Sequence, residues 1–293
     1  MAVAADVTVG VIGLGSMGLG MAQTLAQKEF ATLGFDLSQD RLKLAAESGV
    51  QPLSSLGEAF EKSGFLVFSL PTAKDVAKVV NDNLQILKDR GDRRLIIIDT
   101  STSEPDVSRD LAAQLAALGH GFLDAPVSGG PAGAASGKLA MMIGGADGDL
   151  ANAMPVIEAM TAKALHVGPS GAGNVAKLVN NLLAAAHMVT TSEGLKLALA
   201  AGIDPEAALR VVNAASGRSM ISEVHFPTWV MSDRFDSGFS MGLMRKDVRL
   251  AKELADRTDA LLPLSDVVAQ LWAGSDWADT DDFTRMGSFK SLK

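Results

Sequence analysis

Short apolar runs recur through the first part of the chain, and each ends at or just before a Gly, Asp, Pro or Thr. They cover residues 7–12, 32–36, 65–70, 95–99, 122–124, 139–143 and 164–167. Runs this apolar are typical of buried parallel strands. Apolar residues at helical spacing occupy the intervening segments 17–28, 40–47 and 107–118. Alternation of this kind predicts an α/β fold with a parallel, doubly wound sheet.

The pattern changes from Gly173 onward, and the boundary between the two patterns falls near residues 169–171. Residues 174–200 are almost uninterrupted helix formers. Their apolar stripe consists of Leu178, Leu182, Ala185, Val189 and Leu195. Further helices are predicted over residues 205–214, 246–255 and 264–272, without another strand signal of comparable strength. We therefore expect an α/β domain over residues 1–169 and an all-helical domain over residues 170–293, joined by a long helix.

Composition narrows the range of partners. Hydrophobic residues make up 47% of the 293-residue chain, and the net charge is −8, which disfavours a nucleic-acid partner. No apolar run approaches the roughly 18 to 20 residues that a membrane helix needs. Apolar residues of the helical half exceed what one small domain readily buries, which favours a homo-oligomer. They include Met188, Leu195, Leu197 and Leu199.

Absent residue types exclude several kinds of chemistry. The chain has no Cys and no Tyr, so thiolate catalysis, sulfur-ligated zinc and a Tyr–Lys proton donor are all excluded. Its four His residues show no ligand spacing, so we expect no metal site. The first predicted strand begins at residue 7, which leaves no room for a signal or transit peptide, and we expect a cytoplasmic protein.

A glycine motif joins the first predicted strand to the first predicted helix. It reads Gly13-Leu14-Gly15-Ser16-Met17-Gly18. Gly13 permits a tight turn, Gly15 lets the backbone approach a pyrophosphate, and Gly18 allows close packing of helix and strand. The alternative is a glycine-rich turn with no ligand. The strand–turn–helix context favours a dinucleotide site, and hence a Rossmann domain over residues 1–169.

Asp36 ends the second predicted strand, eighteen residues after Gly18. A carboxylate about twenty residues after the glycines accepts hydrogen bonds from the adenosine ribose and repels a 2′-phosphate. An ordinary turn residue before Ser38 is the alternative reading. Asp36 thus predicts NAD as the cofactor, with NADP kept open because Arg41 is nearby.

Two polar side chains share one face at the start of the long helix. Lys177 and Asn181 are four residues apart. An amine beside a carboxamide can transfer a proton and be oriented while doing so. A solvated surface lysine is the alternative, although the neighbouring residues Val175, Ala176, Leu178 and Val179 are apolar.

The whole chain resembles the 3-hydroxyacid (β-hydroxyacid) dehydrogenase family. The resemblance rests on four ordered motifs, at residues 13–18, 124–130, 171–181 and 246–247, with Gly137 and the pair Gly144-Gly145 after the second. It implies NAD-dependent oxidation of a small anionic hydroxyacid. It also implies a homodimer or homotetramer built on the helical half.

The resemblance also implies roles for single residues. Lys177 is the expected acid/base, and Asn181 binds substrate or positions Lys177, with Asn180 as its rival. Asn174 contacts substrate or caps the helix. The expected carboxylate cradle consists of Ser128, Gly129 and Gly130. The remaining expected cofactor contacts are Leu70 and Pro71, Thr102 at the nicotinamide end, and Lys246 at the edge.

The exact substrate stays open at this stage. Ser216-Gly217-Arg218 resembles the 3-hydroxyisobutyrate branch, whereas Gly173-Asn174-Val175-Ala176-Lys177 is closer to the tartronate semialdehyde branch. L-threonate dehydrogenase, a sulfolactaldehyde-type reductase and a non-catalytic NAD-binding interaction module are further alternatives. Residues 216–239 are expected to shape the substrate pocket, with Arg218, Met220, Trp229 and Phe239 as candidates, and the alternative for the apolar ones is a place in the core.

Overall fold

The computed structural model describes residues 7–289, and the chain divides into two compact units, residues 1–177 and 178–293. The first unit is built on a sheet with strand order β3-β2-β1-β4-β5-β6-β8-β7, and β9 pairs with β8. The strands are β1 (Thr8–Ile12), β2 (Ala31–Phe35), β3 (Gln51–Pro52), β4 (Phe65–Phe68), β5 (Ile96–Asp99), β6 (Gly121–Asp124), β7 (Val127–Ser128), β8 (Leu139–Gly144) and β9 (Thr161–Gly168).

The strands from β3 to β6 in this order are parallel, as the alternating pattern predicts. The prediction of an entirely parallel sheet is wrong at β8, which runs antiparallel to β6 and β7. The reason is the short connection, residues 129–138, between β7 and β8. A parallel return needs a crossover of about a dozen residues or more, usually a helix laid over the sheet.

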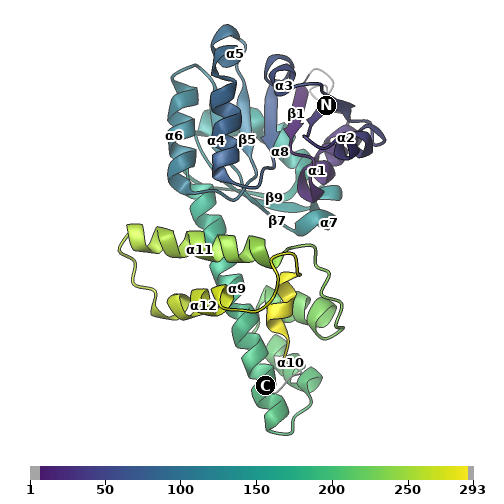
Figure 1. Ribbon diagram of the computed structural model, residues 1–293, viewed down its shortest axis with the longest axis vertical. Helices are drawn as coiled ribbons and strands as arrows, with labels where there is room; N and C mark the ends of the chain where they lie inside the picture. Colours follow the sequence, from purple (N-terminus) through teal and green to yellow (C-terminus); the bar gives the residue numbers. More distant parts are fainter. Residues whose placement is uncertain (1–6, 290–293) are drawn as a thin grey trace. The chain divides into compact units, whose positions relative to one another are not determined.

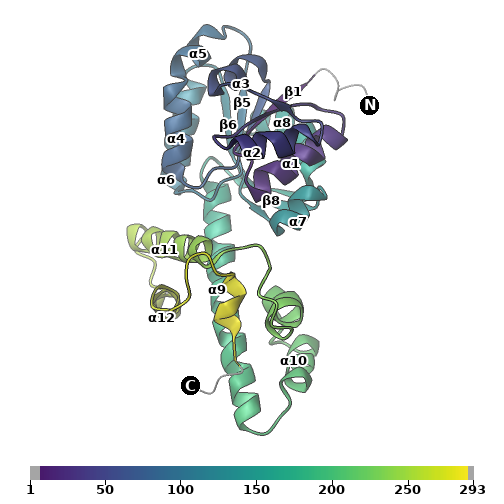
Figure 2. The same cartoon turned by 45° about the vertical axis from the view of Figure 1, so that its right-hand side comes forward.

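Helices cover both faces of this sheet (Figures 1 and 2). One apolar cluster joins the sheet to α1 (Ser16–Gln27), α2 (Gln39–Ala46), α7 (Gly130–Ala135) and α8 (Asp147–Met160). The other joins it to α3 (Leu56–Lys62), α4 (Ala73–Asp82), α5 (Leu84–Asp89) and α6 (Pro105–Ala116). The sequence pattern alone identified three of these eight helices, α1, α2 and α6.

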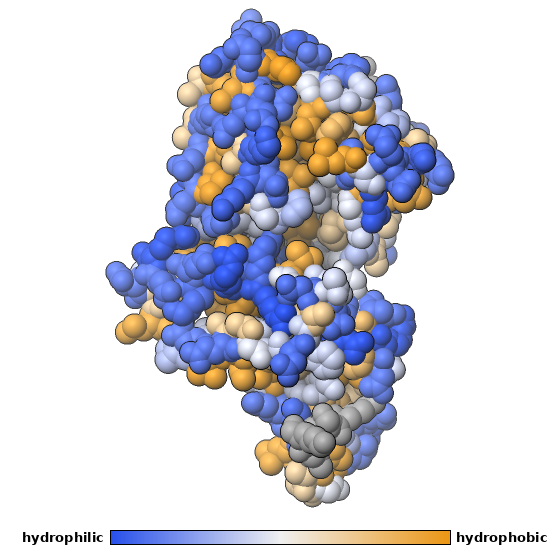
Figure 3. Space-filling model, in the orientation of Figure 1, coloured by the Kyte–Doolittle hydropathy of each residue, from blue (hydrophilic) through white to orange (hydrophobic). Residues whose placement is uncertain are grey.

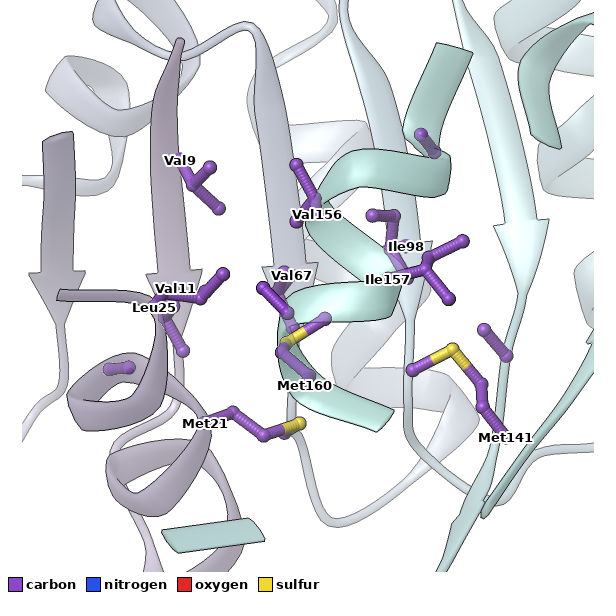
Figure 4. Packing of buried hydrophobic residues seen from close by; sticks show 14 of the residues in the cluster. Val9, Val11, Met21, Leu25, Val67, Ile98, Met141, Val156, Ile157 and Met160 are labelled. Carbon is purple, nitrogen blue, oxygen red and sulfur yellow. The ribbon is translucent and has the colours of Figure 1, made fainter. Parts of the chain in front are cut away.

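Alternation of side chains along each strand supplies both clusters. Val67 faces the α1 and α8 side, while its neighbours Leu66 and Phe68 belong to the other cluster. Figure 4 shows Val9, Val11, Val67 and Ile98 on the face covered by α1 and α8. A strand buried on both faces accommodates few polar side chains along its length. Polar residues of the sheet therefore gather where strands end.

The second unit packs helices around the greater part of α9 (Ala172–Ala200) (Figures 1 and 2). The others are α10 (Pro205–Ala214), the π-helix η1 (Ile221–Val230), α11 (Met241–Arg257), α12 (Pro263–Ala273) and the 3₁₀ helix η2 (Phe283–Gly287). Trp272 is fully buried and its indole N–H donates to the Ala185 carbonyl at 3.2 Å. No described helix combines the length and the apolarity needed to cross a membrane.

The sequence pattern indicated apolar residues of the helical half that one small domain would leave exposed, and two of them lie inside its core. Met188 and Leu195 are 0% and 1% exposed, whereas Leu197 is 72% exposed. Met188 and Leu195 are therefore not apolar residues left over for a subunit interface, and the part of the oligomer prediction that rests on them is wrong. One side of a long helix can bury more apolar surface than a sequence pattern indicates, because α10, η1, α11 and α12 all pack against it.

Candidate active site

The glycine turn after β1 is held against the end of β4. Gly13 has a φ of +87°, and a Cβ there would lie 2.3 Å from the Ser69 carbonyl oxygen. A Cβ on Gly18 would lie 1.8 Å from the Gly13 carbonyl oxygen. Both positions therefore require glycine, one for its backbone conformation and both for space. The turn lies between β2 and β4, where the strand order reverses and dinucleotides bind in open α/β sheets.

Gly15 differs from its two partners because no atom lies within 4 Å of a Cβ built on it. It is the N-cap of α1, it is exposed, and neither a side-chain cap nor an acidic residue occupies the first turn. Ser16 is exposed and Met17 half-buried. Open space before uncapped helical N–H groups suits the diphosphate of a dinucleotide.

Leu14 contributes differently from its neighbours in the motif. Its side chain is 0% exposed and belongs to the apolar core, so only its main chain can face a ligand. That N–H donates to Asp36 Oδ2 at 2.6 Å, and the Ser38 N–H donates to Asp36 Oδ1 at 2.8 Å. The two bonds hold the half-buried carboxylate beside the glycine turn. Since a carboxylate has about four acceptor positions, it can still accept ribose hydroxyls.

The ends of β4 and β5 are joined by hydrogen bonds between their loops. The Leu70 N–H donates to Ser101 Oγ at 3.0 Å, and the Ser101 N–H donates to Asp99 Oδ1 at 3.0 Å. Leu70 and Thr102 are half-buried, and Pro71 is exposed. These predicted cofactor residues therefore lie on two loops that are held together at the same edge as Gly13 and Asp36.

The predicted carboxylate cradle lies where β7 passes into α7. Ser128 pairs with Ala140 of β8, and Gly129 and Gly130 follow with φ values of +129° and +63°. Ser128 is half-buried and Gly129 is exposed. A hydroxyl followed by two positive-φ glycines presents a side-chain donor next to accessible main-chain N–H groups, which suits a small anion.

Asn174 is fully buried at the start of α9, and both ends of its carboxamide are bonded. Oδ1 accepts from the Ser103 N–H at 2.9 Å, and Nδ2 donates to Ser108 Oγ at 3.0 Å. This favours a role in holding the helix over direct contact with substrate.

Asp124 received no role of its own from its motif, yet it organises the same region. It is 0% exposed, and its carboxylate accepts from the Gly171 N–H at 2.7 Å and the Asn174 N–H at 3.0 Å. Burial raises the pKa of the Asp124 carboxyl, and these two N–H groups act in the opposite direction. The available signal was an acid ending a predicted strand, two residues before Pro126.

Lys177 and Asn181 lie one turn apart on α9 and are 7% and 5% exposed. Asn181 Nδ2 donates to Asp247 Oδ2 at 2.6 Å, and Asp247 is 2% exposed. Lys246 Nζ lies 3.7 Å from Asp247 Oδ1. Asp247 therefore joins two predicted site residues, although the sequence pattern gave it no role. The rival Asn180 is exposed and donates to Asn181 Oδ1 at 3.0 Å.

Two family models match the chain, one over the α/β part and one over the helical part. Residues 8–168 match the family model of the NAD-binding domain of 6-phosphogluconate dehydrogenase. Residues 171–287 match the model described as the NAD-binding domain of NADP-dependent 3-hydroxyisobutyrate dehydrogenase.

Individual relatives match over most of their length. Mitochondrial 3-hydroxyisobutyrate dehydrogenase of Mus musculus is 34% identical over 275 residues, covering 92% of this chain and 82% of the relative. 2-(Hydroxymethyl)glutarate dehydrogenase of Eubacterium barkeri is 32% identical over 92% of this chain and 89% of its own. The structure of Mycobacterium tuberculosis 3-hydroxyisobutyrate dehydrogenase with L-serine has a TM-score of 0.87 at 33% identity, covering 96% and 97% of the two chains.

The contrast between Gly15 and Gly18 gives a paired test of the dinucleotide site. Gly15→Ala is expected to leave the melting temperature unchanged, because its φ of −61° suits Ala and the protein leaves room for a methyl group. The same methyl group would meet the diphosphate, so affinity for NAD should fall by about 10-fold or more in calorimetric titration. Gly18→Ala should lower the melting temperature instead. Unchanged NAD affinity in Gly15→Ala would contradict the assignment.

Proposed function

The chain belongs to the 3-hydroxyisobutyrate dehydrogenase family of NAD(P)-dependent enzymes, and we propose that it interconverts a small 3-hydroxy carboxylate and its semialdehyde or keto form. The observation that carries this proposal is the burial of Lys177, which is 7% exposed on α9. Lysine is rarely buried to this extent, and buried titratable groups gather at functional sites. In this family a buried lysine after the Gly171–Asn174 helix start is suited to acid/base work.

The names of the relatives support a more defined substrate class. 3-Hydroxyisobutyrate, 2-(hydroxymethyl)glutarate and the L-serine of the mycobacterial structure all contain a primary alcohol one carbon away from a carboxylate-bearing carbon. They differ in the group on that carbon: a methyl, a carboxyethyl or an amino group. We propose that this chain recognises the shared 3-hydroxypropanoate unit, with tartronate semialdehyde, L-threonate and sulfolactaldehyde chemistry as alternatives for its pocket.

The residues divide the work as follows. Ser128 and the N–H groups of Gly129 and Gly130 bind the carboxylate, which fixes the alcohol relative to Lys177. Lys177 in its neutral form takes the hydroxyl proton during oxidation, and in its charged form returns a proton to the carbonyl oxygen during reduction. Asn181 orients the reacting oxygen or the amine. A nicotinamide cofactor held by the glycine turn and by the loops of Leu70 and Thr102 would supply the hydride acceptor for the alcohol carbon.

The helical half also supports the proposal of a homodimer or homotetramer. Leu264, Val267 and Leu271 follow one another on one face of α12 and are 67%, 51% and 42% exposed. Figure 3 shows hydrophobic residues at the surface along this helix. A contiguous exposed apolar face is unusual for a monomer. Together with the family matches, which end at residue 168 and resume at 171, this supports a substrate and oligomerisation domain over residues 170–293.

Removing the lysine tests the acid/base role. Lys177→Ala is expected to lower kcat by about 10² to 10⁴-fold while NAD still binds, because only proton transfer is lost. In the unaltered enzyme the oxidation rate should rise with pH until the amine has lost its proton. NADH absorbance measures both, and Lys163→Ala on the exposed strand β9 serves as the control. Near-normal turnover in Lys177→Ala would show that another group carries the proton.

Cofactor preference tests Asp36. Because its carboxylate accepts ribose hydroxyls and repels a 2′-phosphate, kcat/KM should be higher with NAD than with NADP. Asp36→Ser should reduce this ratio by about 10- to 100-fold, the range for a lost charged hydrogen bond. Asp40→Ser, an equal change of charge at an exposed position in α2, should leave it unchanged. An unaltered enzyme that prefers NADP would rule out the assignment.

Substrate charge tests the cradle. 3-Hydroxyisobutyrate should be oxidised far better than its uncharged amide, because the amide leaves donors unpaired at a cost of about 1 to 3 kcal/mol. Ser128→Ala should raise KM for the acid more than for the amide, whereas Ser136→Ala on the exposed end of α7 should change neither. Equal oxidation rates on the acid and the amide would contradict the proposal that Ser128, Gly129 and Gly130 bind the substrate carboxylate. NAD binding without turnover of any hydroxyacid would indicate the interaction module.

Light scattering tests the assembly. The unaltered protein is expected to be a dimer or tetramer at micromolar concentration, and Val267→Glu should shift it toward monomer by placing a charge in the apolar face of α12. Gln85→Glu on α5 of the first unit is the control. A protein that is monomeric from the outset would contradict the proposal.

A further inference from the structure

Two buried side chains hold the start of α9, and together they form what we call the α9 junction, Asp124 and Asn174. Asp124 ends β6 and accepts one backbone N–H on each carboxylate oxygen, from Gly171 on Oδ1 and from Asn174 on Oδ2. Both donors belong to the segment that begins α9. The first N–H groups of a helix lack partners within the helix. A carboxylate can accept hydrogen bonds from them, and the positive end of the helix dipole stabilises its negative charge.

Asn174 connects the same helix start to a third segment. Its side chain binds the main chain of Ser103 through Oδ1 and the hydroxyl of Ser108 in α6 through Nδ2. Ser103 and Ser108 are each 1% exposed, so these bonds are shielded from water. Water cannot compete for buried hydrogen bonds of this kind, and they restrain the groups that they join.

Backbone packing leaves little freedom around the junction. A Cβ on Gly173 would lie 2.3 Å from the Asp124 carbonyl oxygen and 2.5 Å from the Met142 carbonyl oxygen. The first turn of α9 therefore lies directly on the backbone of β6 and β8. A helix start that is packed against main-chain atoms and bonded on two sides is strongly restrained.

Three predicted active-site residues lie within four residues of a side chain that forms or contacts the junction. Thr102 immediately precedes Ser103, Ser128 follows Asp124 by four residues, and Lys177 follows Asn174 by three. All of these residues lie in the first compact unit, residues 1–177. The junction thus joins the cofactor loop, the carboxylate loop and the acid/base helix.

We propose that Asp124 and Asn174 are positioning residues, which set Lys177 relative to Thr102 and Ser128 without touching the substrate. This inference rests on the proposed acid/base role of Lys177. Catalytic groups need placement to within about half an ångström, and a displacement of about 1 Å can cost on the order of 10²-fold in rate. Loss of either junction residue therefore reduces proton transfer more than cofactor binding.

The sharpest variant is Asp124→Asn, which keeps the shape of the side chain. A carboxamide has one acceptor oxygen, so one of the two N–H donors would meet an NH₂ group instead. We expect kcat for hydroxyacid oxidation to fall by about 10- to 100-fold. The affinity for NAD, measured by calorimetric titration, should stay within about twofold. Asp149→Asn is the matched control: Asp149 is 7% exposed, is paired with Arg94, lies in the first turn of α8 and makes none of the bonds of the α9 junction.

A double-mutant cycle separates positioning from general damage. In a Lys177→Ala background, Asp124→Asn should lower the remaining rate by less than about twofold, because the group that it positions is already absent. An equal loss in both backgrounds would assign Asp124 a merely structural role and overturn the inference, while leaving Lys177 as the acid/base. High turnover in Lys177→Ala alone would instead overturn the proposed function.

Asn174→Ala provides the second variant if Asp124→Asn does not fold. It leaves Asp124 and both of its backbone donors in place and removes only the connection to Ser103 and Ser108. The same cycle applies, with the same expected loss of kcat and the same small effect in the Lys177→Ala background. Full activity of a folded Asn174→Ala enzyme would overturn the proposed positioning role of Asn174.

Discussion

The parallel pairing of β2, β1, β4, β5 and β6 is the constraint on which the rest of the first unit depends. The pairing continues one residue past the strands. Gly13 donates to the Phe35 carbonyl, Ser69 to Ile12, Thr100 to Phe68 and Ala125 to Asp99, at 2.7 to 2.9 Å. Because parallel strands end at one edge, this register brings the glycine turn and the loops of Asp36, Leu70 and Thr102 together.

Burial of the sheet on both faces explains why the chemistry is confined to that edge. Strand residues alternate between two apolar clusters, so a polar side chain in the middle of a strand would lose its hydration without gaining a partner. At a strand end the main chain leaves the sheet and polar groups can be paired. Asp36, Asp99 and Asp124 all stand at such positions, and each accepts backbone N–H groups. The carboxylates thus stabilise the loops as well as preparing a polar edge.

A buried carboxylate is costly unless its oxygens are hydrogen-bonded, and each oxygen of Asp124 accepts a backbone N–H from the start of α9. The arrangement also explains why the family motif at residues 171–181 begins with small residues. Gly171 and Asn174 supply the N–H groups, and Gly173 lets the helix approach the sheet. In the second unit, Asp247 is buried in a similar way and accepts from Asn181. Carboxylates therefore order the polar residues of α9 within each unit.

The sequence by itself determined the local features: most strands, the long helix, the glycine turn and the acid after β2. Each of these is a pattern of neighbouring residues, with a period of 2 or about 3.6 or a glycine at a required φ. It also identified the dehydrogenase family, through motifs of the same local kind. The antiparallel direction of β8, the helix α8 with Pro155 inside it, and the π-helix η1 were not predicted.

Only the tertiary structure decided which polar residues meet. Asp124 and Asn174 are fifty residues apart in the chain, and Asn181 and Asp247 are sixty-six apart. Burial of Met188 and Leu195 likewise depends on helices that follow much later in the chain. Such pairings follow from how sheet and helices pack, and a pattern of neighbouring residues carries no information about them, because hydrogen bonds and apolar contacts between distant segments form only in the folded chain.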